Sequence, residues 1–175
     1  MNKTKALILT GHCVALGIVL PMLFHGIQYG GQIFSPMHIP VLLAGLIAGP
    51  IFGTLAGLIT PILSSVLTGM PPAALVPAMT VELALFGLCA GLLLQYLPIR
   101  KDEPRVYAAL IGAMLVGRIA AGIVQALIFN FGTYSLQIWL TGYFVTSLPG
   151  IVLHIALIPP VYFTLKKAGL VATVD

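Results

Sequence analysis

The sequence predicts an all-α membrane protein, with six transmembrane helices and both termini in the cytoplasm. Apolar residues make up 59% of the 175 residues and charged residues only 7%, against about 25% charged in globular proteins. The apolar residues form long runs, and nearly all cations lie between these runs. So few charges do not cover a water-facing surface. A soluble protein is therefore excluded, and we expect residues 1–175 to form one transmembrane domain of a multi-pass protein in the cell membrane.

The apolar runs set the number of crossings, because a helix needs about 20 residues to span roughly 30 Å of hydrocarbon. In chain order the runs cover residues 6–24, 38–49, 51–67, 77–97, 106–129 and 139–165. The second and third runs are ambiguous. A single helix over residues 39–67 would be roughly 43 Å long at 1.5 Å per residue, which is too long for one span. Hydropathy alone does not decide whether they form one helix or two.

The cations favour two helices there. Seven of the eight Lys and Arg residues fall in three segments: Lys3 and Lys5; Arg100, Lys101 and Arg105; and Lys166 and Lys167. Such segments face the cytoplasm, so an even number of crossings must separate them. A division at Gly49–Pro50 gives four crossings and then two, whereas five or seven helices would break this pattern. The outer loops, at about residues 25–37, 68–76 and 130–138, then contain no Lys or Arg.

Small residues recur at every fourth position in two of the expected helices. They are Gly45, Gly49, Gly53 and Gly57 in one stretch, and Ala109, Ala113, Gly117 and Ala121 in the other. This spacing lets helix backbones approach closely in lipid, where no hydrophobic effect drives helices together. We expect both stretches to be packing surfaces.

Glu82 and Arg118 are the formal charges expected inside the membrane. A lone charge there costs on the order of 3 kcal/mol, so each should face a partner or a water-filled cavity. Counted from the outer helix ends, Glu82 lies roughly 8 Å deep and Arg118 roughly 15 Å. Since the arginine side chain reaches outward, a direct ion pair between them is feasible. Alternatively, Arg118 meets an anionic or strongly polar ligand, with Gln125 on the same helix face.

The first and third outer loops, with the helix ends beside them, are rich in hydrogen-bonding and aromatic side chains. The candidates for ligand contact there are His25, Gln28, Tyr29, Gln32, His38, Asn130, Tyr134, Trp139 and Tyr143. Tyr and Trp also form interfacial belts, but the amide residues are not typical of a belt. Glycines in the first loop give it freedom to fold over a ligand. We expect an outward-facing pocket with these loops as its roof and Glu82 and Arg118 near its floor.

The common catalytic and metal-binding patterns are missing. The sequence has no Gly-x-Ser-x-Gly elbow, no His-Glu-x-x-His and no phosphate-binding loop. The histidines lack the spacing of a metal site, and we expect His12 and His154 to be satisfied core or interfacial residues. The cations form no patch that would bind nucleic acid. We therefore expect neither an enzyme nor a bound cofactor or metal.

Four segments together resemble a known family. They are Pro36-Met-His-Ile-Pro-Val-Leu-Leu-Ala-Gly-Leu-Ile-Ala-Gly-Pro50, Pro61-Ile-Leu-Ser-Ser-Val-Leu-Thr-Gly-Met-Pro-Pro72, Val81-Glu82-Leu83 and Gly117-Arg118. In a small six-helix chain this combination resembles the substrate-binding S components of energy-coupling-factor (ECF) vitamin transporters, and in particular a pantothenate-type branch. The resemblance covers nearly the whole chain.

The resemblance implies that the chain captures a water-soluble vitamin under its first and third outer loops. It also implies partners, namely an ECF scaffold transmembrane protein and two ATPase subunits. Docking in this family uses small residues on the first helix, commonly in an Ala-x-x-x-Ala pattern. The nearest match here runs from Gly11 to Ala15, with Ala6 earlier on the helix, so the motif is altered.

Pantothenate is the favoured vitamin, because its carboxylate, two hydroxyls and amide suit a pocket with one cation and several amides and phenols. Cobalamin would need a wider, more aromatic and less charged bowl, and folate and riboflavin are further alternatives. The competing class is a structural membrane subunit that transports nothing, in which Glu82 and Arg118 only hold two helices together. A third class, an intramembrane hydrolase or transferase, would need more polar residues near the midplane than this sequence offers.

Overall fold

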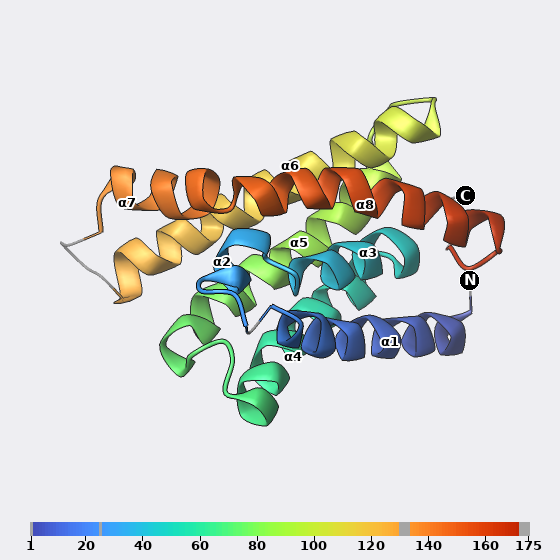
Figure 1. Cartoon of the computed structure of the whole chain (residues 1–175). Helices are drawn as coiled ribbons and strands as arrows, with labels where there is room; N and C mark the ends of the chain where they lie inside the picture. Colours follow the sequence, from blue (N-terminus) through green and yellow to red (C-terminus); the bar gives the residue numbers. More distant parts are fainter. Residues whose placement is uncertain (1, 25, 130–133, 172–175) are drawn as a thin grey trace.

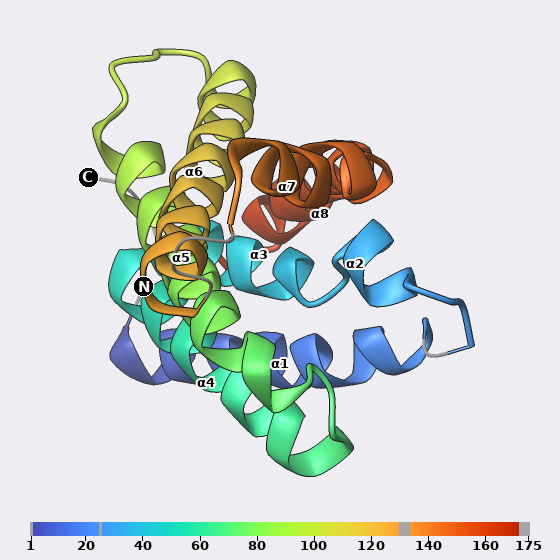
Figure 2. The same ribbon diagram turned by 90° about the vertical axis from the view of Figure 1, so that its left-hand side faces the viewer.

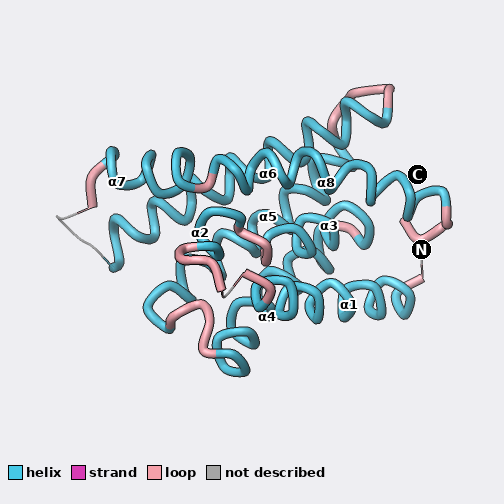
Figure 3. The backbone as a smooth tube through the Cα atoms, in the orientation of Figure 1, coloured by secondary structure: helices cyan, strands magenta, loops and turns pink. Residues whose placement is uncertain are grey.

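The computed structural model describes residues 2–24, 26–129 and 134–171, and all regular structure in these ranges is helical (Figures 1 and 3). The α-helices are α1 (Lys3–Met22), α2 (Gly30–Phe34), α3 (His38–Ala48), α4 (Pro50–Thr68), α5 (Val76–Tyr96), α6 (Asp102–Val124), α7 (Leu136–Leu140) and α8 (Leu148–Lys167). A 3-10 turn precedes α5 at Ala73–Leu75. Turns of π-helix follow α6 and α7, at Gln125–Phe129 and Thr141–Thr146.

Six helical segments among these residues are long and apolar enough to cross a membrane, which confirms the predicted six-helix bundle. They are Lys3–Met22, Gly30–Ala48, Pro50–Thr68, Ala73–Tyr96, Asp102–Leu127 and Leu148–Lys167. The predicted division between the second and third runs is also confirmed, since α3 ends at Ala48 and α4 begins at Pro50. Gly49 between them has a φ of +92°, which glycine adopts freely. Proline suits the first turn of α4, where its missing N–H is not needed.

The segments that carry the cations lie at one end of the bundle. In Figure 1 the two termini and the α5–α6 connection lie toward the right, and α2, α7 and the α4–α5 connection lie toward the left. The Lys5 ammonium donates to the Gly169 carbonyl at 2.6 Å, and Lys166 forms a 2.7 Å ion pair with Asp102. The three cationic segments therefore lie at the same end of the bundle, as an even number of crossings between them requires. The positive-inside rule places this end in the cytoplasm.

Helix α5 lies at the centre of the packing and contacts α3, α4 and α6, as the end-on view in Figure 2 shows. At Gly45, Gly53 and Gly87, an added Cβ would collide with the backbone of a neighbouring helix. The second stretch is also buried, since Ala109 and Ala113 on α6 have no exposed surface. The predicted packing role of the small residues is confirmed. Gly49 also ends α3, and a Cβ added at Gly91 of α5 would meet the carbonyl carbon of Gly49 at 2.8 Å.

Replacing Gly87 by leucine is expected to destabilise the bundle by about 3 kcal/mol or to prevent folding, because the backbones of α4 and α5 would have to separate. The matched control is Gly11→Leu, since no atom lies within 4 Å of a Cβ added at Gly11. The measurement is the thermal unfolding midpoint of each purified variant in detergent. Equal midpoints for the two variants would contradict the close packing of these helices.

The outer connections contain more helix than the sequence suggested. The first loop includes α2, which is bracketed by left-handed backbone at Tyr29 and Ser35. The last apolar run, expected to be one span over residues 139–165, is interrupted at Ser147 between the π-helical turn and α8. Pro149 in the first turn of α8 lacks an N–H and cannot continue a hydrogen-bond ladder from the preceding turn. These irregular turns carry several of the residues that surround the cavity at this end of the bundle.

Candidate ligand-binding site

A cavity of about 800 Å³ lies at the end of the bundle opposite the termini. Its walls come from α2, α3, α5, α6, the α4–α5 connection and the turn before α8. Binding pockets for drug-sized molecules have volumes of roughly 300–1,000 Å³, so the space suits a small molecule.

Most of the predicted ligand-contact residues line this cavity. They are Tyr29, Gln32, His38, Glu82, Arg118, Gln125, Tyr134 and Tyr143. Gln28 is exposed and is not part of the lining, and Trp139 lies behind the lining against Arg118. His25 and Asn130 lie outside the described residues.

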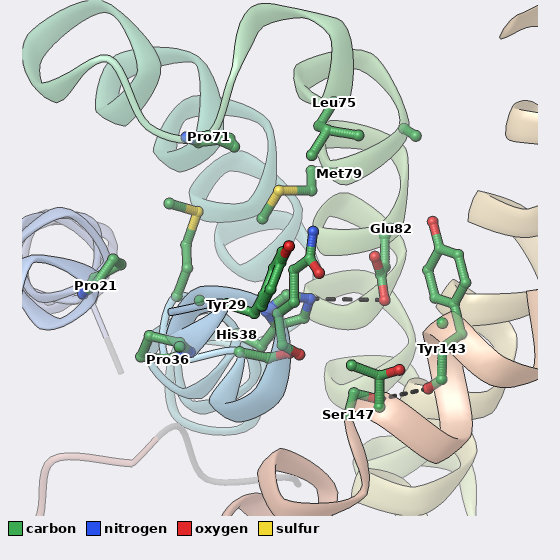
Figure 4. Close-up of a pocket in the computed structure, with 18 of the residues that line it drawn as sticks. Pro21, Tyr29, Pro36, His38, Pro71, Leu75, Met79, Glu82, Tyr143 and Ser147 are labelled. Carbon is green, nitrogen blue, oxygen red and sulfur yellow. Dashed lines mark hydrogen bonds and ion pairs between the residues drawn. The ribbon is translucent and has the colours of Figure 1, made fainter. Parts of the chain in front are cut away.

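Glu82 and His38 lie next to each other in the lining of the cavity. The distance between Glu82 Oε1 and His38 Nε2 is 3.6 Å, and both side chains are buried, at 5% and 7% exposure (Figure 4). The position of His38 is fixed by the start of α3, where its backbone N–H donates to the Ser35 carbonyl at 3.0 Å. The imidazole also packs edge-on against Phe86, with ring centroids 5.3 Å apart. The Glu82 carboxylate therefore lies beside a histidine whose backbone is fixed by Ser35 and whose ring is fixed by Phe86.

Arg118 is held by the turn that precedes α8. Its Nη1 donates to the Tyr143 carbonyl and, at 2.8 Å, to the Ser147 hydroxyl. The guanidinium carbon lies 5.6 Å from the centroid of the Phe144 ring, close enough for a cation–π interaction. Only 2% of the residue is exposed. These neutral contacts orient the cation without neutralising it.

The direct Glu82–Arg118 ion pair that helix counting allowed is not formed in the described part of the chain. Glu82 is instead paired with His38, and Arg118 with the backbone and hydroxyl of the turn before α8. Counting residues along helices gives the depth of a side chain but not the direction in which it points. Both charges nevertheless line the same cavity.

Three buried side-chain atoms in the described residues have no hydrogen-bond partner, namely His38 Nδ1, Arg118 Nε and His154 Nδ1. An unsatisfied buried polar atom costs about 1–3 kcal/mol, so each one needs an explanation. Two of the three belong to residues that line the cavity. A ligand with polar groups would satisfy atoms that the protein leaves unpaired.

His154 supports the site from behind, on α8. It is fully buried, its ring stacks on His38 at a centroid distance of 6.0 Å, and its Nε2 lies 3.2 Å from the Ser35 carbonyl. His154 is thus a core residue, as expected, although its Nδ1 has no hydrogen-bond partner. His12, in contrast, is exposed on α1 and bonds to its own helix at the Ile8 carbonyl.

Sequence reasoning missed Ser147 and the role of His154 in this site. Ser147 directly precedes α8, and His154 follows it by seven positions, or two helical turns. The two residues therefore lie on the same side of this helix. Gly150 lies between them on that side, and a Cβ there would meet the carbonyls of Ile33 and Phe34 at 2.8 Å. This spacing of polar and small residues was the signal available in the sequence.

Trp139 positions Arg118 rather than lining the cavity. Its indole Nε1 donates to the Arg118 carbonyl at 3.0 Å, and its ring packs edge-on against Phe144 at a centroid distance of 5.2 Å. An added Cβ at Gly122 would meet the indole ring directly, so Trp139 needs a glycine on α6 to sit this close. The indole therefore fixes α7 against α6 next to the buried cation.

Phenols and an amide provide neutral hydrogen-bonding groups in the lining that also holds the two charges. Tyr143 lies beside Glu82 in Figure 4, and the side chains of Tyr143 and Gln125 interact. Burial raises the pKa of the Tyr134 phenol, and the negative charge of Glu82 adds to this effect. Tyr134 therefore remains neutral at physiological pH and can donate a hydrogen bond.

The remaining wall is apolar, and the apolar pattern of the sequence did not distinguish its residues from ordinary packing. Met70, Pro71, Leu75 and Met79 come from the α4–α5 connection and the start of α5, and Pro21 comes from the end of α1 (Figure 4). Sites for small molecules commonly combine such apolar walls with a few well-placed polar groups. This wall would accommodate the hydrocarbon part of an amphipathic solute.

The small residues of α1 do not all lie on one surface. Gly11 and Ala15 are exposed, whereas Ala6 is buried in the core at 3% exposure. Five residues separate Ala6 from Gly11, which turns the helix by about 140° from one to the other. Of the three residues suggested for partner docking, only Gly11 and Ala15 are therefore accessible from outside this chain.

The bundle and its cavity define a multi-pass membrane protein with a mixed polar and apolar pocket near the end away from its termini. Comparison with protein-family models matches residues 5–162 to the ECF transporter substrate-specific component family. The chain therefore belongs to this family, whose members are the substrate-binding subunits of transporters, not enzymes, and work with an ECF energising module. Comparisons with curated proteins and with solved structures gave no match.

Proposed function

We propose that the chain is the capture subunit of an ATP-driven vitamin uptake transporter and that it binds pantothenate in the cavity between α2, α5 and the turn before α8. The observation that carries this proposal is Arg118, a buried cation with an unpaired Nε in the wall of a cavity of about 800 Å³. A buried cation whose hydrogen bonds go only to neutral groups is unfavourable in a membrane, and an anionic ligand relieves this.

The chemistry of pantothenate fits the lining groups. Its carboxylate would form charge-assisted hydrogen bonds with Arg118, which are stronger than hydrogen bonds between neutral groups. Its hydroxyls and amide would meet the phenols, amides and the carboxylate of Glu82. Its methyl groups would contact the apolar wall around Met79.

The proposed partners are an ECF scaffold membrane protein and two ATPase subunits, which would supply the energy for uptake. The exposed surface of α1 around Gly11 and Ala15 offers a smooth face for a partner helix. Contact there would leave the binding cavity, at the outer ends of the helices, free to receive its solute.

The alternatives differ in what they require of the cavity. Cobalamin would need a wider and less charged bowl, whereas folate and riboflavin present other patterns of charge. A purely structural subunit would use Glu82 and Arg118 as a packing pair, and the structure gives these residues separate partners. The cavity-lining position of both charges favours a ligand site.

Native mass spectrometry of the detergent-solubilised chain tests this function. We expect a species with the added mass of pantothenate, and we expect solvent extraction to release the vitamin for identification. A different vitamin at the same stoichiometry would support solute capture and replace pantothenate as the substrate. Only lipid, across several independent preparations, would contradict the proposal.

A further inference from the structure

We infer that the site selects monoanions and that Glu82 is the residue that determines this specificity. In this arrangement the ligand anion binds Arg118, and hydrogen-bond donors at the other end of the ligand face Glu82. The inference rests on the proposed function, because it concerns the same cavity, but it specifies charge and orientation that the choice of vitamin leaves open.

The Arg118 end is built to accept one anionic group. Nη1 is occupied by Tyr143 and Ser147, and Nε has no partner. Guanidinium nitrogens lie in one plane and match the geometry of carboxylate oxygens. The anchoring of Nη1 fixes this plane, so an anion in the cavity meets a preorganised donor rather than a mobile side chain.

The Glu82 end accepts hydrogen bonds but cannot donate them while it is ionised. His38 lies on one side of Glu82 and Tyr143 on the other, as Figure 4 shows. A ligand hydroxyl or amide N–H that approaches Glu82 gains an acceptor. A second anionic group that approaches meets the negative charge of a carboxylate that is buried at 5% exposure, and is repelled.

The lining holds one cation and one carboxylate at separate positions, which gives a single anionic group of the ligand one place to bind. Glu82 and Arg118 are the only Asp, Glu, Lys or Arg residues among the described residues that line the cavity. Glu82 lies 3.6 Å from the imidazole of His38, whereas the hydrogen-bond acceptors of Arg118 are a carbonyl and a hydroxyl. A neutral ligand would offer no carboxylate to the unpaired Arg118 Nε, and a dianion would add negative charge beside Glu82.

Paired probes that differ only in charge test the inference. Pantothenol replaces the carboxylate of pantothenate with an alcohol, and 4′-phosphopantothenate adds negative charge at the opposite, hydroxyl end. We expect the wild-type chain in detergent to bind pantothenate at least 100-fold more tightly than either analogue, as measured by equilibrium dialysis. An affinity for pantothenol comparable to that for pantothenate would overturn the inference that the site selects monoanions.

The variant Glu82→Gln tests the role assigned to Glu82. In this variant the ratio of the Kd for 4′-phosphopantothenate to the Kd for pantothenate should fall at least tenfold. The ratio of the Kd for pantothenol to the Kd for pantothenate should stay unchanged, because Arg118 is still present. The control is Gln28→Ala, since Gln28 is exposed and lies outside the lining. If the Kd ratio for the phosphorylated analogue were unchanged in folded Glu82→Gln protein, Glu82 would not be the residue that excludes the second charge.

Failure of the inference can be told apart from failure of the proposed function. Should another vitamin be the substrate, the same comparison applies to nicotinate with nicotinamide and to biotin with its amide. Tighter binding of the carboxylate member supports the inference, and equal or tighter binding of the neutral member overturns it while solute capture stands. Absence of binding by every vitamin tested would overturn both.

Discussion

The Arg118→Gln variant is expected to bind pantothenate at least 100-fold more weakly than the wild-type chain. Hydrogen bonds to a charged group contribute about 1.5–3 kcal/mol, and roughly 2.8 kcal/mol corresponds to a factor of 100 in Kd. The loss should be large because the ligand carboxylate would remain in the cavity without a counter-ion. The measurement is equilibrium dialysis with labelled pantothenate, alongside thermal unfolding of both proteins.

The variant Arg118→Lys serves as the matched comparison. Lysine keeps the positive charge but lacks the planar set of donors, so affinity should fall between those of the wild type and Arg118→Gln. A structural role for Arg118 predicts a different pattern, in which both variants unfold at lower temperature and the folded fraction binds normally. Wild-type affinity in folded Arg118→Gln protein would exclude Arg118 from the ligand site.

The second large effect concerns stability. The variant His38→Leu is expected to lower the free energy of unfolding by roughly 3 kcal/mol, because it leaves the buried Glu82 carboxylate without its partner. For a chain of this size that corresponds to about 6–12 °C in Tm. The measurement is the thermal unfolding midpoint in detergent without added ligand.

The double variant His38→Leu/Glu82→Leu provides the control. Replacing both members of a buried polar pair removes the unpaired charge, so much of the lost stability should return. If the double variant were no more stable than His38→Leu, the destabilisation would come from lost packing against Phe86 and not from the charge on Glu82.

The membrane topology could be predicted because lipid imposes few solutions on the chain. Backbone groups in hydrocarbon must be satisfied within each helix, so long apolar runs translate directly into spans. The cationic segments then fixed the count at an even number between them, and the structure bears out six spans and the division at Gly49. The short helices α2 and α7 were not predicted, because α2 and the start of α7 lie outside the long apolar runs of the sequence.

The polar residues of the site could be predicted only as a set. Charges and amides near the outer helix ends are costly in lipid, and this cost by itself singles out Glu82, Arg118 and Gln125 in the sequence. Their partners could not be predicted in this way, since the pairing of Glu82 with His38 depends on the rotation of α3 against α5. Similarly, the Ser147 hydroxyl reaches Arg118 only because the last span is interrupted at that residue.

The glycine contacts among α3, α4 and α5 have a consequence for how such a protein can diverge. Because backbones touch at Gly45, Gly53 and Gly87, mutation at these positions is confined to residues of almost no bulk. The walls contributed by α6 and the turn before α8, and by α2 apart from Gly30, carry no such restriction at their lining residues. Descendants of this chain would therefore adapt to a new solute by exchanging side chains on those mutable walls, while the three interlocked helices stay constant as an inherited frame.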